Sequence, residues 1–216
     1  MEKIRIVLAD DHPIVLMGVT EFIERDERYS IVAQAQTSSE LVELLRCEKP
    51  DIVITDYNMP GDDIYGDGVK LIEYLIRHFP EVKLLVLTML SNKLILSRLY
   101  DLGVGGVVLK NGDLKELPLA LDSLAKGNRY HGQVLQVTDS VVKAPLESME
   151  ERIASLSVKE FEVLRLFASG MSVRDIAQAQ NRSVKTVSTQ KITSMRKLKV
   201  DNDHALLTFC IGMNLI

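Results

Sequence analysis

The sequence lacks the features that mark secreted, disulfide-stabilised or membrane-spanning proteins. Its 216 residues include only two cysteines, Cys47 and Cys210, which lie far apart and have no metal-ligand spacing. We expect both to be reduced thiols that pack inside a cytoplasmic protein. No apolar run reaches the ~18 residues that a membrane span needs, and no secretory signal opens the chain. We therefore expect no membrane partner.

Motifs of several enzyme classes are also missing. No serine or cysteine nucleophile faces a base in a recognisable arrangement. Gly103, Gly105 and Gly106 come before an apolar run instead of opening a helix, so they do not form a dinucleotide-binding fingerprint. The chain has no internal repeat and no low-complexity tract. We do not expect the protein to be an enzyme.

The charge is unevenly divided along the chain. The formal net charge is −4, but residues 1–150 carry 16 basic and 24 acidic side chains, a net −8, whereas residues 151–216 carry 10 and 6, a net +4. This asymmetry predicts two domains with different partners, the basic one facing a polyanion. A chance fluctuation would give the same numbers, so charge alone does not decide the matter.

The first 126 residues predict a doubly wound α/β domain. Short, continuously apolar runs, typical of parallel strands covered on both faces, alternate with amphipathic segments. The predicted strands cover residues 4–9, 31–35, 52–55, 84–87 and 106–109, and the predicted helices cover residues 14–24, 39–46, 69–78, 94–102 and 114–126. The sequence thus predicts a five-stranded parallel sheet with five helices, over residues 1–126.

The alternation of apolar runs and amphipathic segments ends after residue 126. Residues 127–150 hold glycine, proline and scattered polar groups without a period, so we predict a linker. Residues 151–216 predict an all-α domain of four helices. Ser157 with Glu160 forms a capping box, Gly170 ends that first helix, and three more helices are expected over about 172–180, 184–198 and 203–213.

Polar residues follow four of the predicted strands. Asp10 and Asp11 follow the first strand, Asp56 the third, Thr88 the fourth and Lys110 the fifth. Strand ends of a doubly wound sheet converge on one crevice. Three carboxylates there repel one another unless a cation lies among them, and Mg²⁺ is the usual divalent ion beside phosphoryl groups. Each residue has a plain alternative, such as a helix cap for Asp11, but the whole set predicts a site.

This site suits phosphoryl transfer. Asp56 can attack a phosphorus centre and form an acyl phosphate, while the metal and Lys110 neutralise charge on the transferred group. The Thr88 hydroxyl can donate a hydrogen bond to a phosphoryl oxygen. His12 is expected to have a positional role.

The same residues resemble the receiver domain of response regulators, together with Met59-Pro60 and Asp67-Gly68. The resemblance covers residues 1–126 and implies a flavodoxin-like fold, with phosphotransfer to Asp56 from a histidine kinase or histidine phosphotransfer protein. It also implies that Asp10, Asp11, Asp56 and the backbone carbonyl of Asn58 bind Mg²⁺.

Two positions depart from the usual receiver pattern. The loop Gly61 to Gly66 is longer than usual, and Val107 stands where many receivers carry an aromatic residue on the fifth strand. Both features, with Asp11 to Leu16 and Arg77 to Pro80, resemble regulators of the Rcs phosphorelay. That resemblance implies heterodimers with auxiliary LuxR-type regulators in addition to homodimers.

The basic end predicts a helix-turn-helix. Over 184–198, Val184, Val187, Met195 and Leu198 are expected on the buried face, opposite a polar and basic face that suits the major groove of double-stranded DNA. A solvated charged face is the plain alternative. Residues 155–213 resemble a LuxR-type helix-turn-helix, which implies a tetrahelical DNA-binding domain. The candidate DNA contacts are Arg182, Lys185, Thr186, Ser188, Thr189, Lys191, Ile192, Arg196 and Lys197.

Together these features predict a transcription regulator that dimerises when Asp56 is phosphorylated. Three alternatives stay open. An aspartyl phosphatase would need Asp-x-Asp after the first strand, where this chain has Asp10-Asp11. An FMN carrier would need a hydroxyl-rich phosphate loop there. A receiver-like regulator that acts without phosphate would keep the fold and the DNA reader.

Overall fold

The computed structural model describes residues 3–60, 62, 64–89, 93–112, 115–132, 152–153 and 155–212. The chain forms two compact units, which give an α/β domain and a helical domain with separate hydrophobic cores. Within the described residues, no helix is long and apolar enough to cross a membrane.

A parallel sheet of six strands forms the α/β domain, in the order β2-β1-β3-β4-β5-β6. Chain order and spatial order differ at β1, as expected for a doubly wound sheet, and ligands of such sheets bind beyond the strand ends at that point. Asp10 follows β1 there, and Asp56 ends the neighbouring strand β3. The strands are β1 Ile4–Ala9, β2 Tyr29–Ala35, β3 Ile52–Asp56, β4 Lys83–Thr88, β5 Gly106–Leu109 and β6 Tyr130–His131.

The sixth strand corrects the expected number of five. Tyr130 and His131, within the segment predicted as a linker, pair in parallel with Gly106 and Val107 of β5. Gly106 makes this pairing possible, because a Cβ atom there would lie 3.1 Å from the Cβ of Tyr130 and 2.9 Å from a side-chain carbon of Leu85. The rest of the predicted linker, residues 133–150, lies outside the described residues.

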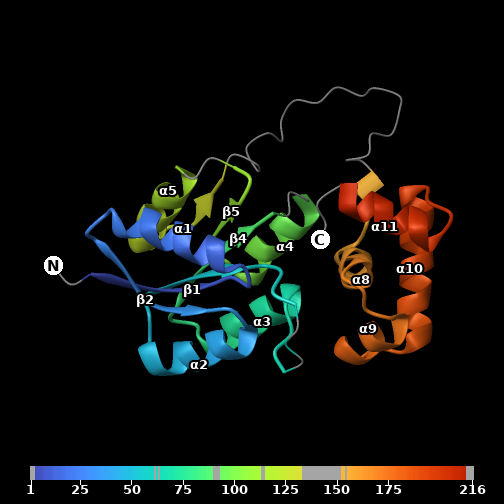
Figure 1. The fold of residues 1–216 in the computed structure, drawn as a ribbon, viewed down its shortest axis with the longest axis horizontal. Helices are drawn as coiled ribbons and strands as arrows, with labels where there is room; N and C mark the ends of the chain where they lie inside the picture. The colour runs from blue at the N-terminus through green and yellow to red at the C-terminus, as the bar shows by residue number, and fades with distance from the viewer. Residues whose placement is uncertain are drawn as a thin grey trace. The chain divides into compact units, whose positions relative to one another are not determined.

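Helices cover both faces of the sheet (Figure 1). Helices α1 and α5 pack on one face, where side chains from the five strands β1 to β5 form a single apolar core with them. Helices α2 and α3 lie on the other face (Figure 1). The bounds are α1 Pro13–Glu24, α2 Ser38–Glu48, α3 Gly68–His78, α4 Lys93–Leu102 and α5 Glu116–Ala125.

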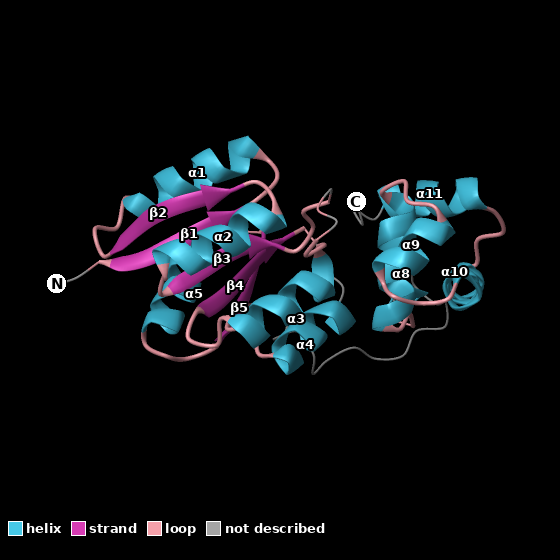
Figure 2. Ribbon diagram, turned by 90° about the horizontal axis from the view of Figure 1, so that it is seen from below, coloured by secondary structure: helices cyan, strands magenta, loops and turns pink. Residues whose placement is uncertain are grey.

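Four helices make up the second domain, which contains no strand among its described residues (Figure 2). They are α8 Val158–Ala168, α9 Val173–Ala179, α10 Val184–Leu198 and α11 Asp203–Gly212. Arg152 and Ile153 are also helical, an addition to the four helices expected. The core joins Val163 of α8, Ile176 and Ala177 of α9 and Val187 of α10.

Serine caps fix where three of these helices begin. Ser157 and Ser172 each form a capping box with the acidic residue three positions later, and the Ser183 hydroxyl accepts the Thr186 amide. Each cap satisfies a backbone donor that the helix itself leaves without a partner. The capping box expected at Ser157 and Glu160 is confirmed.

The two cysteines differ in their surroundings. Cys210 is buried in α11, where burial raises the pKa of its thiol to about 11. Cys47 is exposed on α2, so the expectation that both thiols pack inside the protein is wrong for this one. Neither forms a disulfide.

Candidate functional site

The ends of β1, β3 and β5 bring three charged side chains together. Asp10 directly follows β1, Asp56 is the last residue of β3, and Lys110 directly follows β5. Asp10 and Asp56 are only 1% and 5% exposed. Burial disfavours the charged forms of such side chains, so a buried cluster of two carboxylates and one lysine is a candidate functional site.

Lys110 bridges the two acids. Its Nζ atom lies 2.6 Å from Asp10 Oδ2 and donates to Asp56 Oδ2 at 2.7 Å. The second oxygen of Asp10 accepts the backbone N–H of His12 at 3.0 Å. Three of the residues expected from the strand ends, Asp10, Asp56 and Lys110, therefore lie together, with the ammonium group held between two carboxylates.

Burial and charge act in opposite directions on these groups. Burial raises the pKa of Asp56, and the nearby Asp10 carboxylate adds to this, while Lys110 and a backbone hydrogen bond from Asn58 oppose it; the net shift is upward. Burial lowers the pKa of Lys110, but Asp56 and Asp10 together raise it above its ordinary value. Lys110 thus stays positively charged and favours the ionised form of Asp56.

Asp11 and His12 extend the cluster toward solvent. His12 Nδ1 lies 2.8 Å from Asp11 Oδ1 and 3.4 Å from Asp10 Oδ1. Ligand atoms of Asp10, Asp11 and His12 all lie within 4.8 Å of one another. The alternative in which Asp11 caps α1 is wrong, because the cap residue is His12 and no side chain caps that helix.

Thr88 ends β4 beside this cluster. It is buried, and its backbone carbonyl accepts the Lys110 N–H at 2.8 Å. Lys110 is thereby held directly alongside the end of β4.

The long loop after β3 contains a residue that sequence reasoning missed. The Asp62 carboxylate accepts the backbone N–H of Ser39 at 2.6 Å, and also those of Ile64 and Tyr65. Burial raises the pKa of Asp62, but these hydrogen bonds, first those from Ser39, lower it below its usual value. Asp62 thus ties the loop to the N-terminus of α2. Gly61 and Asp63 of this loop lie outside the described residues.

Tyr100 of α4 lies beside Val107, the position where many receivers carry an aromatic residue on the fifth strand. Its hydroxyl donates to the Tyr130 carbonyl at 2.7 Å and accepts the Val107 N–H at 3.2 Å, and its ring stacks on His131 with centroids 4.7 Å apart. The aromatic ring beside β5 is therefore supplied by α4. Nothing at Val107 itself would have indicated this.

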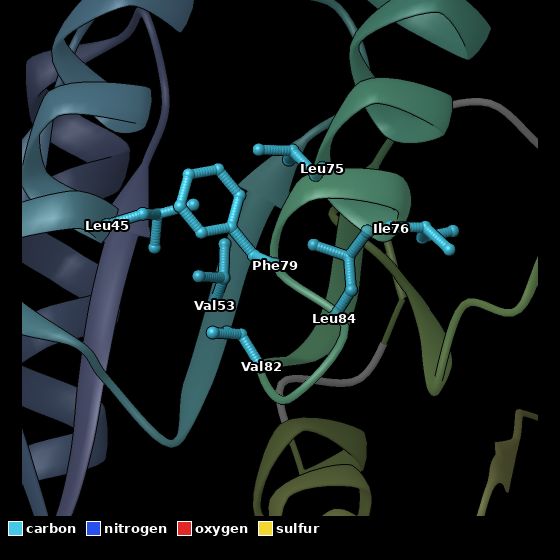
Figure 3. A pocket seen from close by; sticks show the side chains of 7 residues that line it. All are labelled: Leu45, Val53, Leu75, Ile76, Phe79, Val82 and Leu84. Carbon is cyan, nitrogen blue, oxygen red and sulfur yellow. The ribbon is translucent and has the colours of Figure 1, made fainter.

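A small pocket elsewhere in the α/β domain is not a candidate site. It lies between α2, α3 and the sheet, and Figure 3 shows the Phe79 ring directed toward Leu45 across it. No side chain that lines it can form a hydrogen bond or carry a charge, so nothing there would orient a ligand. The lining residues are Leu45, Val53, Leu75, Ile76, Phe79, Val82 and Leu84.

In the helical domain, α10 presents a mixed polar face. Lys185, Thr186, Thr189, Ile192 and Arg196 are exposed, and Ser188 is half-buried. These residues stand opposite a buried side that includes Val187 and Leu198. The exposed face agrees with the expected one.

Three expectations for this domain need correction. Val184 was expected on the buried face but is exposed, because it stands in the first helical turn, beyond the core. Lys191, expected on the exposed face, is buried: its Nζ lies 3.6 Å from the Phe167 ring centroid and 2.7 Å from Asp203 Oδ1, so its ammonium group is engaged within the domain. Lys197 is also engaged elsewhere, since its ammonium donates to Glu160 at 2.7 Å and to the Ser155 carbonyl at 2.9 Å.

Arg182 lies just before the cap of α10 and is half-buried. Its Nη1 atom donates to Gln180 at 2.9 Å and to Gln190 at 3.4 Å. The guanidinium is therefore held at the N-terminal end of the exposed face.

Comparison with known families follows the same division of the chain. Residues 6–122 match the response regulator receiver domain, and residues 154–210 match the bacterial regulatory proteins of the luxR family. The chain belongs to the response regulators with a LuxR-type C-terminal domain. The family resemblance carried by the aspartates, Lys110 and the C-terminal motifs is thereby confirmed.

This response regulator is similar over its full length to RcsB. It is 43% identical to the transcriptional regulatory protein RcsB of Salmonella typhi, over 100% of this chain and 97% of that protein. RcsB from Salmonella enterica serovar Typhimurium, solved bound to the promoter rprA with the phosphomimetic BeF3−, is 42% identical with a TM-score of 0.81, covering 97% of this chain and 100% of that one. An RcsB–DNA complex matches with 43% identity and a TM-score of 0.76, covering 96% and 98%.

Proposed function

We propose that the protein accepts a phosphoryl group on Asp56, dimerises, and binds double-stranded DNA through α10 to regulate transcription. The observation that carries the proposal is the position of Lys110, within 2.6 Å of Asp10 and 2.7 Å of Asp56 at the strand ends. A fixed ammonium group beside one reactive carboxylate is what stabilises charge on a phosphoryl group during transfer.

In the proposed step, a carboxylate oxygen of Asp56 attacks the phosphorus atom of a phosphohistidine on a histidine kinase or a histidine phosphotransfer protein. A P–O bond forms and the P–N bond breaks, with its electron pair left on the imidazole, which takes up a proton. Lys110 would then exchange its contact with the Asp56 carboxylate for one with a phosphoryl oxygen. The Thr88 hydroxyl would donate a hydrogen bond to another phosphoryl oxygen.

The acidic cluster fits Mg²⁺. Asp10, Asp11, Asp56 and the backbone carbonyl of Asn58 supply hard oxygen ligands, and three carboxylates outnumber the single charge of Lys110. The close approach of Asp10 and Asp11 ligand atoms, within 4.8 Å, supports the fit. When bound, Mg²⁺ would neutralise charge on the incoming phosphoryl group.

The exposed face of α10 is the proposed DNA reader. Arg182 and Arg196 suit phosphates, which set affinity and salt dependence, while Lys185, Thr186, Ser188, Thr189 and Ile192 suit base edges. One such module buries too little surface for tight specific binding, so we expect a dimer on paired half-sites. The similar RcsB has been solved as two dimers bound to two parallel DNAs. Heterodimers with auxiliary LuxR-type regulators belong to the same proposal.

Transfer of a labelled phosphoryl group tests the acceptor. The full chain incubated with labelled acetyl phosphate and Mg²⁺ should take up about one phosphoryl group per chain, since one aspartate reacts. Asp56→Ala should take up none, whereas Asp101→Ala, which removes an exposed acid on α4, should behave like wild type. Uptake by Asp56→Ala at the wild-type level would exclude Asp56 as the acceptor.

A further inference from the structure

The exposed face of α10 that is proposed to contact DNA, here called the reading face, includes a large apolar side chain, Ile192. Ile192 is 61% exposed. Lys185, Thr189 and Arg196 stand seven and three positions before it and four after it, which places all four on one face of the helix. Each of these three neighbours is polar or charged and exposed.

Single exposed apolar residues are common on protein surfaces, so the exposure of Ile192 alone indicates nothing. Its position does, because it stands within the face proposed to enter the major groove. The hydroxyl proton of its neighbour Thr189 is already used, because this hydroxyl donates a hydrogen bond to the Lys185 carbonyl within the helix at 2.9 Å. At this point of the face, the helix presents hydrocarbon to whatever it meets.

Isoleucine has no donor or acceptor to offer a base edge. A base pair that pressed polar edge atoms against Ile192 would remove their water without replacing its hydrogen bonds, which costs free energy. Among the four standard bases, thymine alone presents an apolar group in the major groove, its 5-methyl.

We infer that Ile192 is a specificity-determining residue that packs against a thymine 5-methyl group in each half-site and so selects an A·T pair there. This inference rests on the proposed function, since it assumes that α10 enters the major groove.

Deoxyuridine substitution tests the contact without altering the protein. Duplexes that bind the full-length, acetyl phosphate-treated chain are first selected from a random pool. Each thymine of the selected sequence is then replaced in turn by deoxyuridine, which keeps the base pairing and removes only the methyl group. We expect one position per half-site at which wild-type affinity falls about fourfold, which corresponds to one methyl group lost from an apolar contact.

Variants assign that methyl contact to a residue. Ile192→Ala should bind the thymine and deoxyuridine duplexes equally. Ile64→Ala, which truncates a 72% exposed isoleucine of the α/β domain, should keep the wild-type preference for thymine.

Two results would overturn the inference. Either the wild type shows no deoxyuridine-sensitive position, or Ile192→Ala keeps the same sensitivity. A different failure, in which no duplex is selected at all, would overturn the proposed DNA-binding function and the Ile192 assignment with it.

Discussion

At the scale of single residues, two lysines of α10 have different surroundings: one is exposed and the other is buried. Lys185 is exposed on the reading face of α10. Lys191, six positions later, is only 9% exposed, with its ammonium over the Phe167 ring and against Asp203. A long apolar stem lets a lysine cover hydrophobic surface while its charge keeps a partner. A basic residue on a recognition helix is therefore not in itself a DNA contact.

This difference predicts that substitution by alanine changes a different property at each position. Lys191→Ala should lower the free energy of unfolding of the helical domain by about 1–2 kcal/mol, through lost packing and a lost cation–π contact. Lys185→Ala should change stability by less than about 0.5 kcal/mol and instead reduce the salt dependence of DNA binding. Urea unfolding measures the change in stability, and DNA binding at two salt concentrations measures the change in salt dependence. Equal stability losses in both variants would contradict the structure.

Asp62 gives a second residue-scale prediction, with a definite pH dependence. Its carboxylate accepts three backbone N–H groups, and its pKa is lowered. A lowered pKa means that the carboxylate contributes stability at neutral pH and loses it as the pH falls through that pKa. The free energy of unfolding of Asp62→Ala should therefore be about 1–2 kcal/mol lower than that of the wild type at pH 7.

The size of that difference should shrink toward zero in strong acid, where Asp62 is protonated in the wild type too. Thermal unfolding across a pH series measures it, with Asp101→Ala as the control for loss of an exposed acid. A constant difference between pH 7 and pH 2 would show that the carboxylate charge is not what holds the loop.

At the scale of helices and strands, two helix ends depend on left-handed backbone conformations that their lysines do not favour. Lys49 ends α2 with φ 46°, and Lys199 ends α10 with φ 57°. Both lysines occupy the left-handed region that glycine adopts at much lower cost.

A glycine scan of α2 tests this. Lys49→Gly should raise the free energy of unfolding by about 0.5–1 kcal/mol, because it relieves the left-handed conformation. Glu43→Gly, at an exposed position inside the same helix, should lower it by about 1 kcal/mol. If Lys49→Gly is as destabilising as Glu43→Gly, the conformation assigned to Lys49 is wrong.

Most strands and helices were predictable, and the exceptions have physical reasons. Continuous apolar runs marked β1 to β5, and their ends located Asp10, Asp56 and Lys110 together. The sixth strand is only two residues long, and neither Tyr130 nor His131 belongs to an apolar run. It forms because Gly106 leaves room for Tyr130 and Tyr100 hydrogen-bonds across β5 and β6. Such contacts depend on tertiary structure that no local pattern encodes.

At the scale of the whole molecule, the charge division along the chain corresponds to two kinds of chemistry. The acidic part contains the cluster proposed to accept a phosphoryl group and to bind Mg²⁺, and the basic part contains the exposed face of α10. In the proposed mechanism, phosphorylation of Asp56 shifts an equilibrium toward dimers. The second DNA-binding domain then acts at a high effective concentration.

The affinity of the full chain for a selected duplex, measured with and without acetyl phosphate and Mg²⁺, tests this mechanism most directly. We predict that the phosphodonor tightens wild-type binding about tenfold, within the usual range of coupling between sites, and leaves the binding of Asp56→Ala unchanged. Tightening of equal size in Asp56→Ala, or none in a wild-type protein that has taken up phosphate, would contradict control of DNA binding by Asp56.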